Sequence, residues 1–195
     1  MTRIIAGRLG GRSLAVPPAG TRPTTDRVRE ALFSAVDARI DLDGAAVLDL
    51  FAGSGALGVE ALSRGAVTAC FVESDPRAVS CLRGNVRGLA AELDGVRTEV
   101  RRGTLPGALD GPCPVPGGFD LVLADPPYEQ AARLDAPVLD ALVAGGWLAP
   151  GALVVWERSR RGEATRWPDA LEVGFSRTYG DTLVEIARPA GADAW

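Results

Sequence analysis

The sequence of 195 residues contains no histidine and no lysine, so all 21 of its basic residues are arginines. These absences exclude catalytic triads and metal sites that depend on histidine, and they exclude Schiff-base chemistry on lysine. Any general acid or base in this protein would therefore have to be Asp, Glu or Tyr.

Cysteines and long apolar runs are also scarce. Cys70, Cys81 and Cys113 are too few and too widely spaced to predict a disulfide framework or a zinc site, so no metal is expected. Cys70 lies in an apolar run and is interpreted as a small core residue. There is no run of about 18 apolar residues that would predict a membrane span, and the N-terminus lacks the apolar core of a signal peptide. We therefore expect a cytoplasmic protein without membrane contact, and a monomer by default.

Charge is unevenly distributed along the chain. The formal net charge is −4, which argues against a uniformly basic nucleic-acid binder. Residues 1–30 nevertheless hold six arginines against two acids, a net charge of +4. This basic end could bind a polyanion, or it could be a solvated arginine-rich surface. The six arginines are Arg3, Arg8, Arg12, Arg22, Arg27 and Arg29.

The N-terminal pattern predicts a small hairpin followed by a helix. Residues 3–16 read as two short strands around Gly10-Gly11. A stretch rich in proline follows, and Thr24 or Thr25 can cap the next helix. The apolar stripe of that helix leaves Arg27 and Arg29 free to lie off it.

From residue 45 onward, strands and helices alternate. A chain of this length suits one domain, and the alternation predicts a doubly wound, mostly parallel α/β sheet. A terminal hairpin adds an antiparallel strand near one edge. Residues 105–118 are expected to form a surface loop. The expected strands cover residues 45–50, 67–73, 96–100, 119–124, 152–156, 171–178 and 182–187, and the expected helices cover residues 56–64 and a segment that starts at Pro76 after the cap Asp75.

A glycine-rich turn follows the first strand of this alternating region. Gly53-Ser54-Gly55-Ala56-Leu57-Gly58 matches G-x-G-x-x-G, and Glu73 lies 20 residues beyond Gly53. The pattern indicates an adenosine cofactor, because the glycines allow close backbone approach and the acid can accept from ribose hydroxyls. A dinucleotide and S-adenosylmethionine both fit, although a tight turn without a ligand is the simpler alternative. Asp49 favours S-adenosylmethionine, since a carboxylate repels a pyrophosphate and attracts an ammonium group.

The tetrapeptide Asp125-Pro126-Pro127-Tyr128 follows the predicted strand at residues 119–124. Open α/β sheets bind their ligands at the carboxyl ends of strands. Asp125 offers an acceptor, the prolines leave neighbouring carbonyls free, and Tyr128 offers a face for stacking. The combination suits a planar base with an exocyclic amino group, although an ordinary Asp-Pro turn is the structural alternative.

These motifs resemble a known family. The string Asp49–Gly55, Glu73 and Asp125–Tyr128 are similar to those of class I, S-adenosylmethionine-dependent amino-methyltransferases, which have a Rossmann-like seven-stranded sheet. The strings at residues 3–7, 11–12 and 22–33, with Tyr179-Gly180-Asp181-Thr182, resemble the RsmD family. That family methylates the N2 amino group of one guanine in the small-subunit (16S) ribosomal RNA of bacteria. The resemblance spans nearly the whole chain, and its arginine-rich N-terminal string is the part specific to the family.

The resemblance implies a role for each motif. Residues 1–23 would form a hairpin and linker that bind RNA through the six arginines, and residues 24–195 the methyltransferase domain. The substrate would be ribosomal RNA within the assembled 30S subunit. The catalytic residues would be Asp125, Pro126, Pro127 and Tyr128. Thr104 departs from the family pattern, because an acid usually contacts the cofactor adenine there. The cofactor residues would be Asp49, Phe51, Gly53, Ser54, Gly55, Gly58, Glu73, Ser74 and Thr104.

Three other functions remain open at this stage. A NAD-dependent oxidoreductase would use the same glycines but would leave Asp125–Tyr128 and the basic end without a role. A DNA adenine or protein glutamine N-methyltransferase would use the tetrapeptide, but residues 1–33 do not call for either. A ribosome-assembly factor that binds RNA without catalysis would not need Asp49, Glu73, Asp125 and Tyr128.

Overall fold

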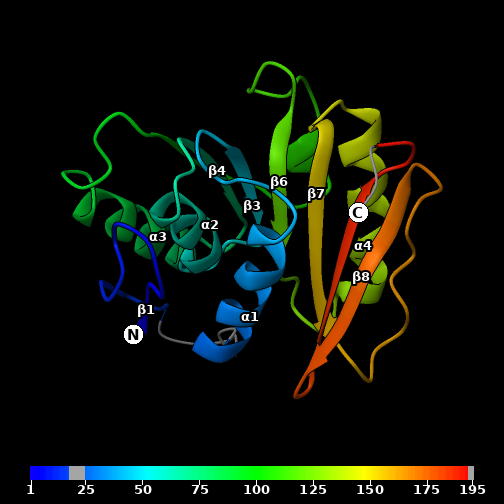
Figure 1. Cartoon of the computed structure of the whole chain (residues 1–195), viewed down its shortest axis with the longest axis horizontal. Helices are drawn as coiled ribbons and strands as arrows, with labels where there is room; N and C mark the ends of the chain where they lie inside the picture. The colour runs from blue at the N-terminus through cyan, green and yellow to red at the C-terminus, as the bar shows by residue number, and fades with distance from the viewer. Residues whose placement is uncertain (18–24, 193–195) are drawn as a thin grey trace.

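A computed structural model of the chain describes residues 1–17 and 25–192. Seven strands form one sheet in the order β5-β4-β3-β6-β7-β9-β8 (Figure 1). The strands are β3 (Ala46–Leu50), β4 (Thr68–Glu73), β5 (Arg97–Arg102), β6 (Phe119–Ala124), β7 (Leu148–Ser159), β8 (Leu171–Tyr179) and β9 (Thr182–Pro189).

The first five strands in this order are parallel, and β9 runs antiparallel to both β7 and β8. This arrangement confirms the predicted doubly wound sheet with an antiparallel strand near one edge. Parallel neighbours need crossover connections, and α2 (Ala56–Ser63), α3 (Pro76–Gly88) and α4 (Ala131–Ala144) supply three of them.

Helices cover both faces of the sheet. The helices α1 (Asp26–Asp37), α2 and α3 share one apolar cluster with it, and that cluster includes Phe33 and Phe71. On the other face, α4 and the short 3-10 helix η1 (Gly107–Leu109) pack around Trp147 and Trp156. Because both faces are covered, β3 is buried along its whole length and β6 at every position except Asp120, as expected for a parallel sheet.

Three features of the fold differ from the sequence expectation. The expected surface loop at residues 105–118 contains η1, whose Leu109 is buried in the core. The helix α4 was not anticipated, although Leu134, Val138 and Leu142 repeat every four residues; Pro137 interrupts the pattern within the helix. The strand β7 covers Leu148–Ser159 rather than residues 152–156, because pairing with β9 extends it beyond the apolar run.

The N-terminal segment forms the predicted hairpin, with very short strands β1 (Thr2–Arg3) and β2 (Ser13–Leu14). Its apolar residues Ile4, Leu9 and Leu14 are about 1% exposed and belong to the cluster beneath α1 and α2. The segment therefore packs on the core of the sheet domain. Figure 1 shows β1 on the side of the molecule where α1 and α2 lie.

Two smaller expectations are also confirmed. Thr25 caps α1 and accepts a hydrogen bond from the Val28 N–H at 3.4 Å, as one of the two candidate caps. Cys70 is buried, as predicted for a core residue, and burial raises the pKa of its thiol to about 12. No helix within the described residues has the length and apolar character needed to cross a membrane.

Candidate functional site

The predicted site residues gather at the carboxyl edge of the parallel strands. Leu50 at the end of β3 pairs with Val72 in β4 and with Ala124 in β6. The residues that follow these three positions are Phe51, Glu73 and Asp125. The register therefore brings the glycine turn, the acid and the tetrapeptide to one edge of the sheet, as the sequence predicts.

The turn after β3 has an unusual backbone. Phe51 has a φ of 59° and is the single non-glycine residue with positive φ in the described part of the chain. This conformation costs about 1–2 kcal/mol for a residue with a Cβ, and such positions cluster at functional sites. Beyond it, Gly53 and Gly55 also have positive φ, at 54° and 82°.

The two glycines serve different purposes. A Cβ at Gly55 would lie 2.3 Å from the Leu82 side chain, so a larger residue cannot fit between the turn and α3. A Cβ at Gly53 would meet nothing nearer than the Phe51 carbonyl at 3.9 Å. The space before Gly53 is therefore free for a ligand to approach the backbone.

Glu73 holds the turn in place. Its carboxylate accepts hydrogen bonds from the Gly53 N–H at 2.8 Å and from the N–H groups of Ser74 and Asp75 at 2.7 and 2.8 Å. Gly103 donates its N–H to the Glu73 carbonyl at 3.0 Å, and the exposed Thr104 follows it. Glu73, Ser74 and Thr104 thus lie at neighbouring strand ends beside the glycine turn.

Asp49 lies beneath the turn and is 1% exposed. Its carboxylate accepts a hydrogen bond from the Gly58 N–H in α2 at 2.8 Å. Burial raises the pKa of Asp49 well above its ordinary value; the Gly58 hydrogen bond lowers it, and the charges of Asp125 and Glu73 raise it further. Three carboxyl groups therefore share this edge, which favours a cationic ligand over a pyrophosphate.

The tetrapeptide presents its polar end to the same edge. Asp125 is half-buried, Pro126 is buried, and Tyr128 is 46% exposed. The Tyr128 hydroxyl lies 3.0 Å from the Thr182 hydroxyl at the start of β9. The ring is thus open to solvent while its hydroxyl is held, which suits stacking on a planar group.

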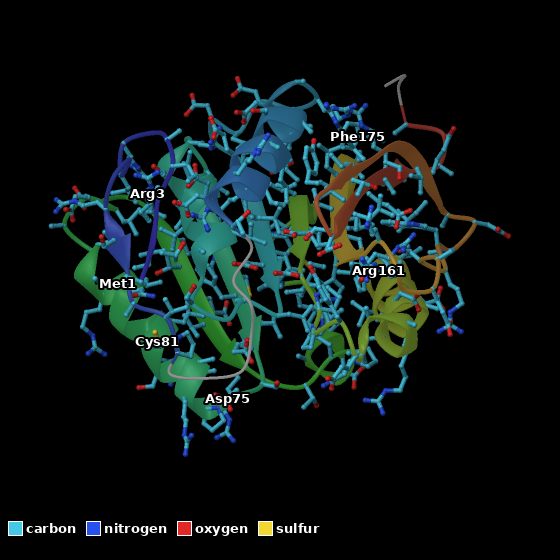
Figure 2. The ribbon with its side chains drawn as sticks, turned by 90° about the horizontal axis from the view of Figure 1, so that it is seen from below. Met1, Arg3, Asp75, Cys81, Arg161 and Phe175 are labelled. Atoms are coloured by element: carbon cyan, nitrogen blue, oxygen red, sulfur yellow. The ribbon has the colours of Figure 1, made fainter. Side chains whose placement is uncertain are left out.

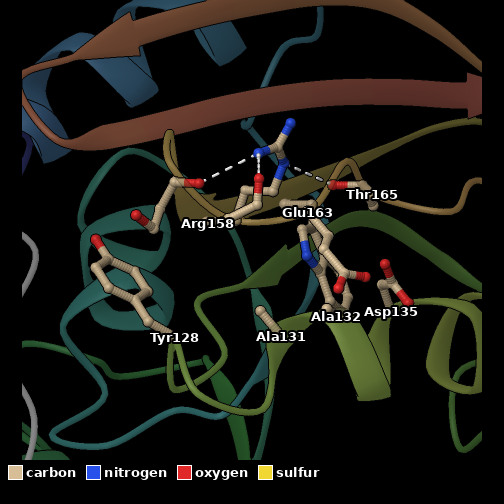
Figure 3. Close-up of a pocket in the computed structure, with 10 residues that line it drawn as sticks. Tyr128, Ala131, Ala132, Asp135, Arg158, Glu163 and Thr165 are labelled. Carbon is tan, nitrogen blue, oxygen red and sulfur yellow. Dashed lines mark hydrogen bonds between the residues drawn. The ribbon is translucent and has the colours of Figure 1, made fainter.

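A pocket adjoins Tyr128 on the side of α4. Figure 3 shows Tyr128, Ala131 and Asp135 on one side, and Arg158 with its hydrogen bond to Thr165 on another. Trp156 also lines this pocket, and its indole N–H is buried without a hydrogen-bond partner within the described residues. The pocket places hydrogen-bonding groups next to the exposed tyrosine ring.

The arginines expected to contact RNA fall into several groups. Arg8 and Arg27 are exposed, while Arg3 pairs with Asp26 and Arg12 pairs with Glu92 at the surface. Arg22 lies outside the described residues.

Arg29 requires a correction, because it is 1% exposed and cannot reach an RNA phosphate from this position. Its guanidinium donates to the Arg3 carbonyl and, at 2.9 Å, to Asp26, and lies 4.0 Å from Glu60. The helical pattern alone leaves Arg29 off the apolar stripe, but the N-terminal segment covers that side of α1.

Sequence reasoning also missed two polar residues that hold the site together. Glu60 is fully buried and accepts hydrogen bonds from the Ile5 and Ala6 N–H groups at 2.7 and 3.0 Å. Asn85 bonds the backbone of Ala15 and donates to the Ser54 carbonyl at 2.9 Å. A polar residue within a predicted helix of apolar character is the signal that could have marked Glu60.

The fold and this site define a class I methyltransferase. The strand order, the glycine turn that opens α2 and the acid at the end of β4 all belong to that class. Within the described residues, no group of three or more His, Cys, Asp or Glu side chains could hold a metal ion.

Comparison with known proteins gives the family. Residues 2–188 match the family model described as Conserved hypothetical protein 95, and the chain belongs to this family, the RsmD family. It is 42% identical over 156 residues to the Ribosomal RNA small subunit methyltransferase D of Escherichia coli, covering 80% of this chain and 73% of that protein. It is 37% identical over 191 residues to YlbH of Bacillus subtilis, whose name proposes an rRNA methyltransferase, covering 97% of this chain and 100% of that protein. The solved structure of yhhF from Escherichia coli has a TM-score of 0.79 and 33% identity, with 98% of both chains covered. The chain is thus a methyltransferase enzyme.

Proposed function

We propose that this enzyme transfers a methyl group from S-adenosylmethionine to the exocyclic N2 amino group of a guanine in small-subunit (16S) ribosomal RNA. The observation that carries the proposal is the placement of Asp125 and the exposed Tyr128 ring beside the glycine turn and Glu73. The relatives named for small-subunit rRNA methylation support the substrate class. The reaction would take place in the cytoplasm, with the assembled 30S subunit as substrate and a monomer as the active form.

The cofactor residues fit S-adenosylmethionine better than a dinucleotide. Gly53 leaves its backbone open to a ligand, and Glu73 can exchange a backbone hydrogen bond for ribose hydroxyls. The shared negative charge at this edge matches a cofactor with ammonium and sulfonium groups. Ser54, Gly55 and Gly58 shape the turn, and Phe51 and Ser74 flank it. The exposed Thr104 hydroxyl would accept a hydrogen bond from the adenine amino group.

When bound, S-adenosylmethionine supplies a sulfonium methyl that is already activated by its own charge. The protein therefore mainly has to position the amino group. In this proposal, the carboxylate of Asp125 and the carbonyl of Pro126 accept hydrogen bonds from the NH2 group. Those bonds would draw the nitrogen toward tetrahedral geometry and aim its lone pair at the methyl carbon. As the N–C bond formed, the S–C bond would break and leave a thioether, and the nitrogen would release one proton to Asp125 or to water. Pro127 fixes the turn, and Tyr128 stacks on the base, which contributes about 1–3 kcal/mol.

The test is the Asp125→Ala variant, with the exposed Asp110→Ala as a matched control. The Asp125 variant should lose methyl transfer to small subunits that lack the modification, while its affinity for S-adenosylhomocysteine stays near that of the wild type. Asp110→Ala should keep both properties. A wild-type rate for Asp125→Ala would rule out this mechanism.

Mass mapping of the labelled RNA identifies the substrate. Methyl transfer to a guanine N2 in the rRNA is the expected result, and parallel assays with naked rRNA and assembled subunits separate these two substrates. Label that appears in DNA or in protein instead would contradict the proposed function.

A further inference from the structure

The turn between β8 and β9 reaches the tetrapeptide across the sheet. Thr182 follows Tyr128 by 54 residues in sequence, yet their hydroxyl groups lie 3.0 Å apart. Tyr128 is 46% exposed as a residue, so neighbouring side chains leave much of it uncovered. The hydroxyl contact therefore restrains a ring whose stacking depends on its orientation.

The turn that follows β7, at residues 160–162, is bonded to the turn between β8 and β9. The Arg160 N–H donates to the Asp181 carbonyl at 2.9 Å. The Asp181 carboxylate lies 3.4 Å from the Arg160 guanidinium and 3.9 Å from that of Arg161. We call residues 160–162 and 179–182 the paired turns.

The paired turns carry positive charge that is open to solvent. The side chains of Arg160 and Arg161 are 48% and 77% exposed. One carboxylate cannot occupy all the donors of two guanidinium groups, because each has five N–H bonds. Asp181 thus holds both arginines in place and leaves residues 160–162 and 179–182, taken together, with a net positive charge.

This charge lies far from the basic N-terminal segment. Figure 2 shows Arg3 and Arg161 toward opposite sides of the molecule. The sheet order agrees, because the N-terminal segment bonds α2, which connects β3 and β4, whereas β9 and β8 are the last two strands at the other end of the sheet. An RNA strand held only by the N-terminal arginines would be bound on one side of the site and would have no basic contact on the other side.

We propose that the paired turns form a second RNA-contacting surface next to the target base. In this inference, which rests on the proposed function, Arg160 and Arg161 contact phosphates beside the target nucleotide, and Thr182 is a positioning residue that orients Tyr128. Charge complementarity with a polyanion and continuity with the tetrapeptide favour RNA over a protein partner. The family motif Tyr179-Gly180-Asp181-Thr182 thereby gains a role in the site.

The first experiment tests the hydroxyl contact. Thr182→Val should lower kcat/KM for small subunits by about three- to tenfold, as expected for one lost hydrogen bond, without changing the affinity for S-adenosylhomocysteine. Thr182→Ser should restore the wild-type value. Thr178→Val, on the exposed part of β8, is the matched control and should have no effect.

A double-mutant cycle then identifies the partner. Tyr128→Phe should cause a loss similar to that of Thr182→Val, and the double variant should lose no more than either alone, because both remove the same contact. Additive losses would overturn the positioning role of Thr182.

The second experiment tests the charge. The double variant Arg160→Gln/Arg161→Gln should reduce the slope of log affinity against log salt by about 1.4 on single-stranded RNA containing guanine, at about 0.7 per phosphate contact. Arg87→Gln/Arg97→Gln, exposed positions that lie outside the paired turns, changes the net charge equally and should leave the slope unaltered.

The outcomes separate this inference from the proposed function. If the wild type does not methylate rRNA, the proposed function fails. If the wild type methylates rRNA but the Thr182 variants keep the wild-type kcat/KM and the arginine variant keeps the wild-type salt slope, only the paired-turn inference fails. A defect seen with assembled subunits but absent with single-stranded RNA would assign the surface to a ribosomal protein and overturn the RNA contact.

Discussion

Asp49 is a carboxyl group kept away from water, with Asp125 and Glu73 adding negative charge nearby. Its pKa is therefore higher in the folded protein than in the unfolded chain. As the pH rises, the unfolded chain loses this proton first, so ionisation of Asp49 favours unfolding. The contribution of Asp49 to stability is fully present below its unfolded pKa and is lost as the pH rises through its folded pKa.

The Asp49→Asn variant isolates this effect, since an amide oxygen can still accept the Gly58 N–H. We expect the free energy of unfolding of the wild type, relative to that of this variant, to fall as the pH rises from about 4. The total fall is about 1.4 kcal/mol for each unit by which folding raises the Asp49 pKa. Above the folded pKa the difference should stay constant. Urea unfolding of both proteins across pH 4–7 measures it. If the wild type instead became more stable relative to Asp49→Asn as the pH rises, the raised pKa of Asp49 would be contradicted.

At the scale of single elements, α2 anchors the N-terminal segment through Glu60. The buried carboxylate accepts two backbone N–H groups from residues 5 and 6 and pairs with Arg64 at 2.9 Å. Arg8 and Leu9 donate their N–H groups to Ser63 at the end of the same helix. The backbone N–H groups of residues 5, 6, 8 and 9 therefore all depend on α2 for their acceptors.

Glu60→Ala should lower the free energy of unfolding by about 3–5 kcal/mol, because it leaves the Ile5 and Ala6 N–H groups without their acceptor and removes the buried carboxylate that pairs with Arg64. Glu99→Ala removes a partly exposed pair with Arg101 and should cost less than about 1 kcal/mol. Denaturant unfolding of both variants gives the comparison, and equal losses would show that burial does not set the value of the Glu60 contacts.

At the scale of the whole molecule, the net charge of −4 hides a basic end on an acidic body. Arg8 and Arg27 are the exposed N-terminal arginines for which the structure gives no ion pair within its described residues. Arg8→Gln/Arg27→Gln should reduce the salt slope of RNA binding by about 1.4, as measured by filter binding.

Arg29→Gln is the informative contrast, because its guanidinium is buried. It should lower the stability of the fold and leave the salt slope unchanged. A smaller slope for the folded Arg29 variant would return this residue to the RNA-binding surface.

The sequence could predict the sheet and the edge where the site lies, because both follow from local patterns. Apolar runs mark the buried strands, and the glycine turn and tetrapeptide stand directly after two of them. Neighbouring parallel strands then bring Asp125 and Glu73 to one edge.

The contacts that join distant segments could not be predicted. Glu60 accepts hydrogen bonds from the N–H groups of residues 5 and 6, and the Thr182 hydroxyl contacts the Tyr128 hydroxyl. Each of these contacts joins residues more than 50 positions apart. A single sequence gives no signal for such pairs. Arg29 was misassigned for the same reason, since the segment that buries it comes from another part of the chain.

The position of β9 has a consequence for the newly made chain. It follows β7 and β8 in synthesis but lies between them in the sheet. Until residues 182–189 emerge from the ribosome, β8 has no strand beside it and β7 has an open edge. Thr182 arrives with the same strand, so Tyr128 gains its hydroxyl contact only when the sheet closes. A nascent chain halted at the β8–β9 turn would hold the glycine turn and the tetrapeptide but would lack this restraint.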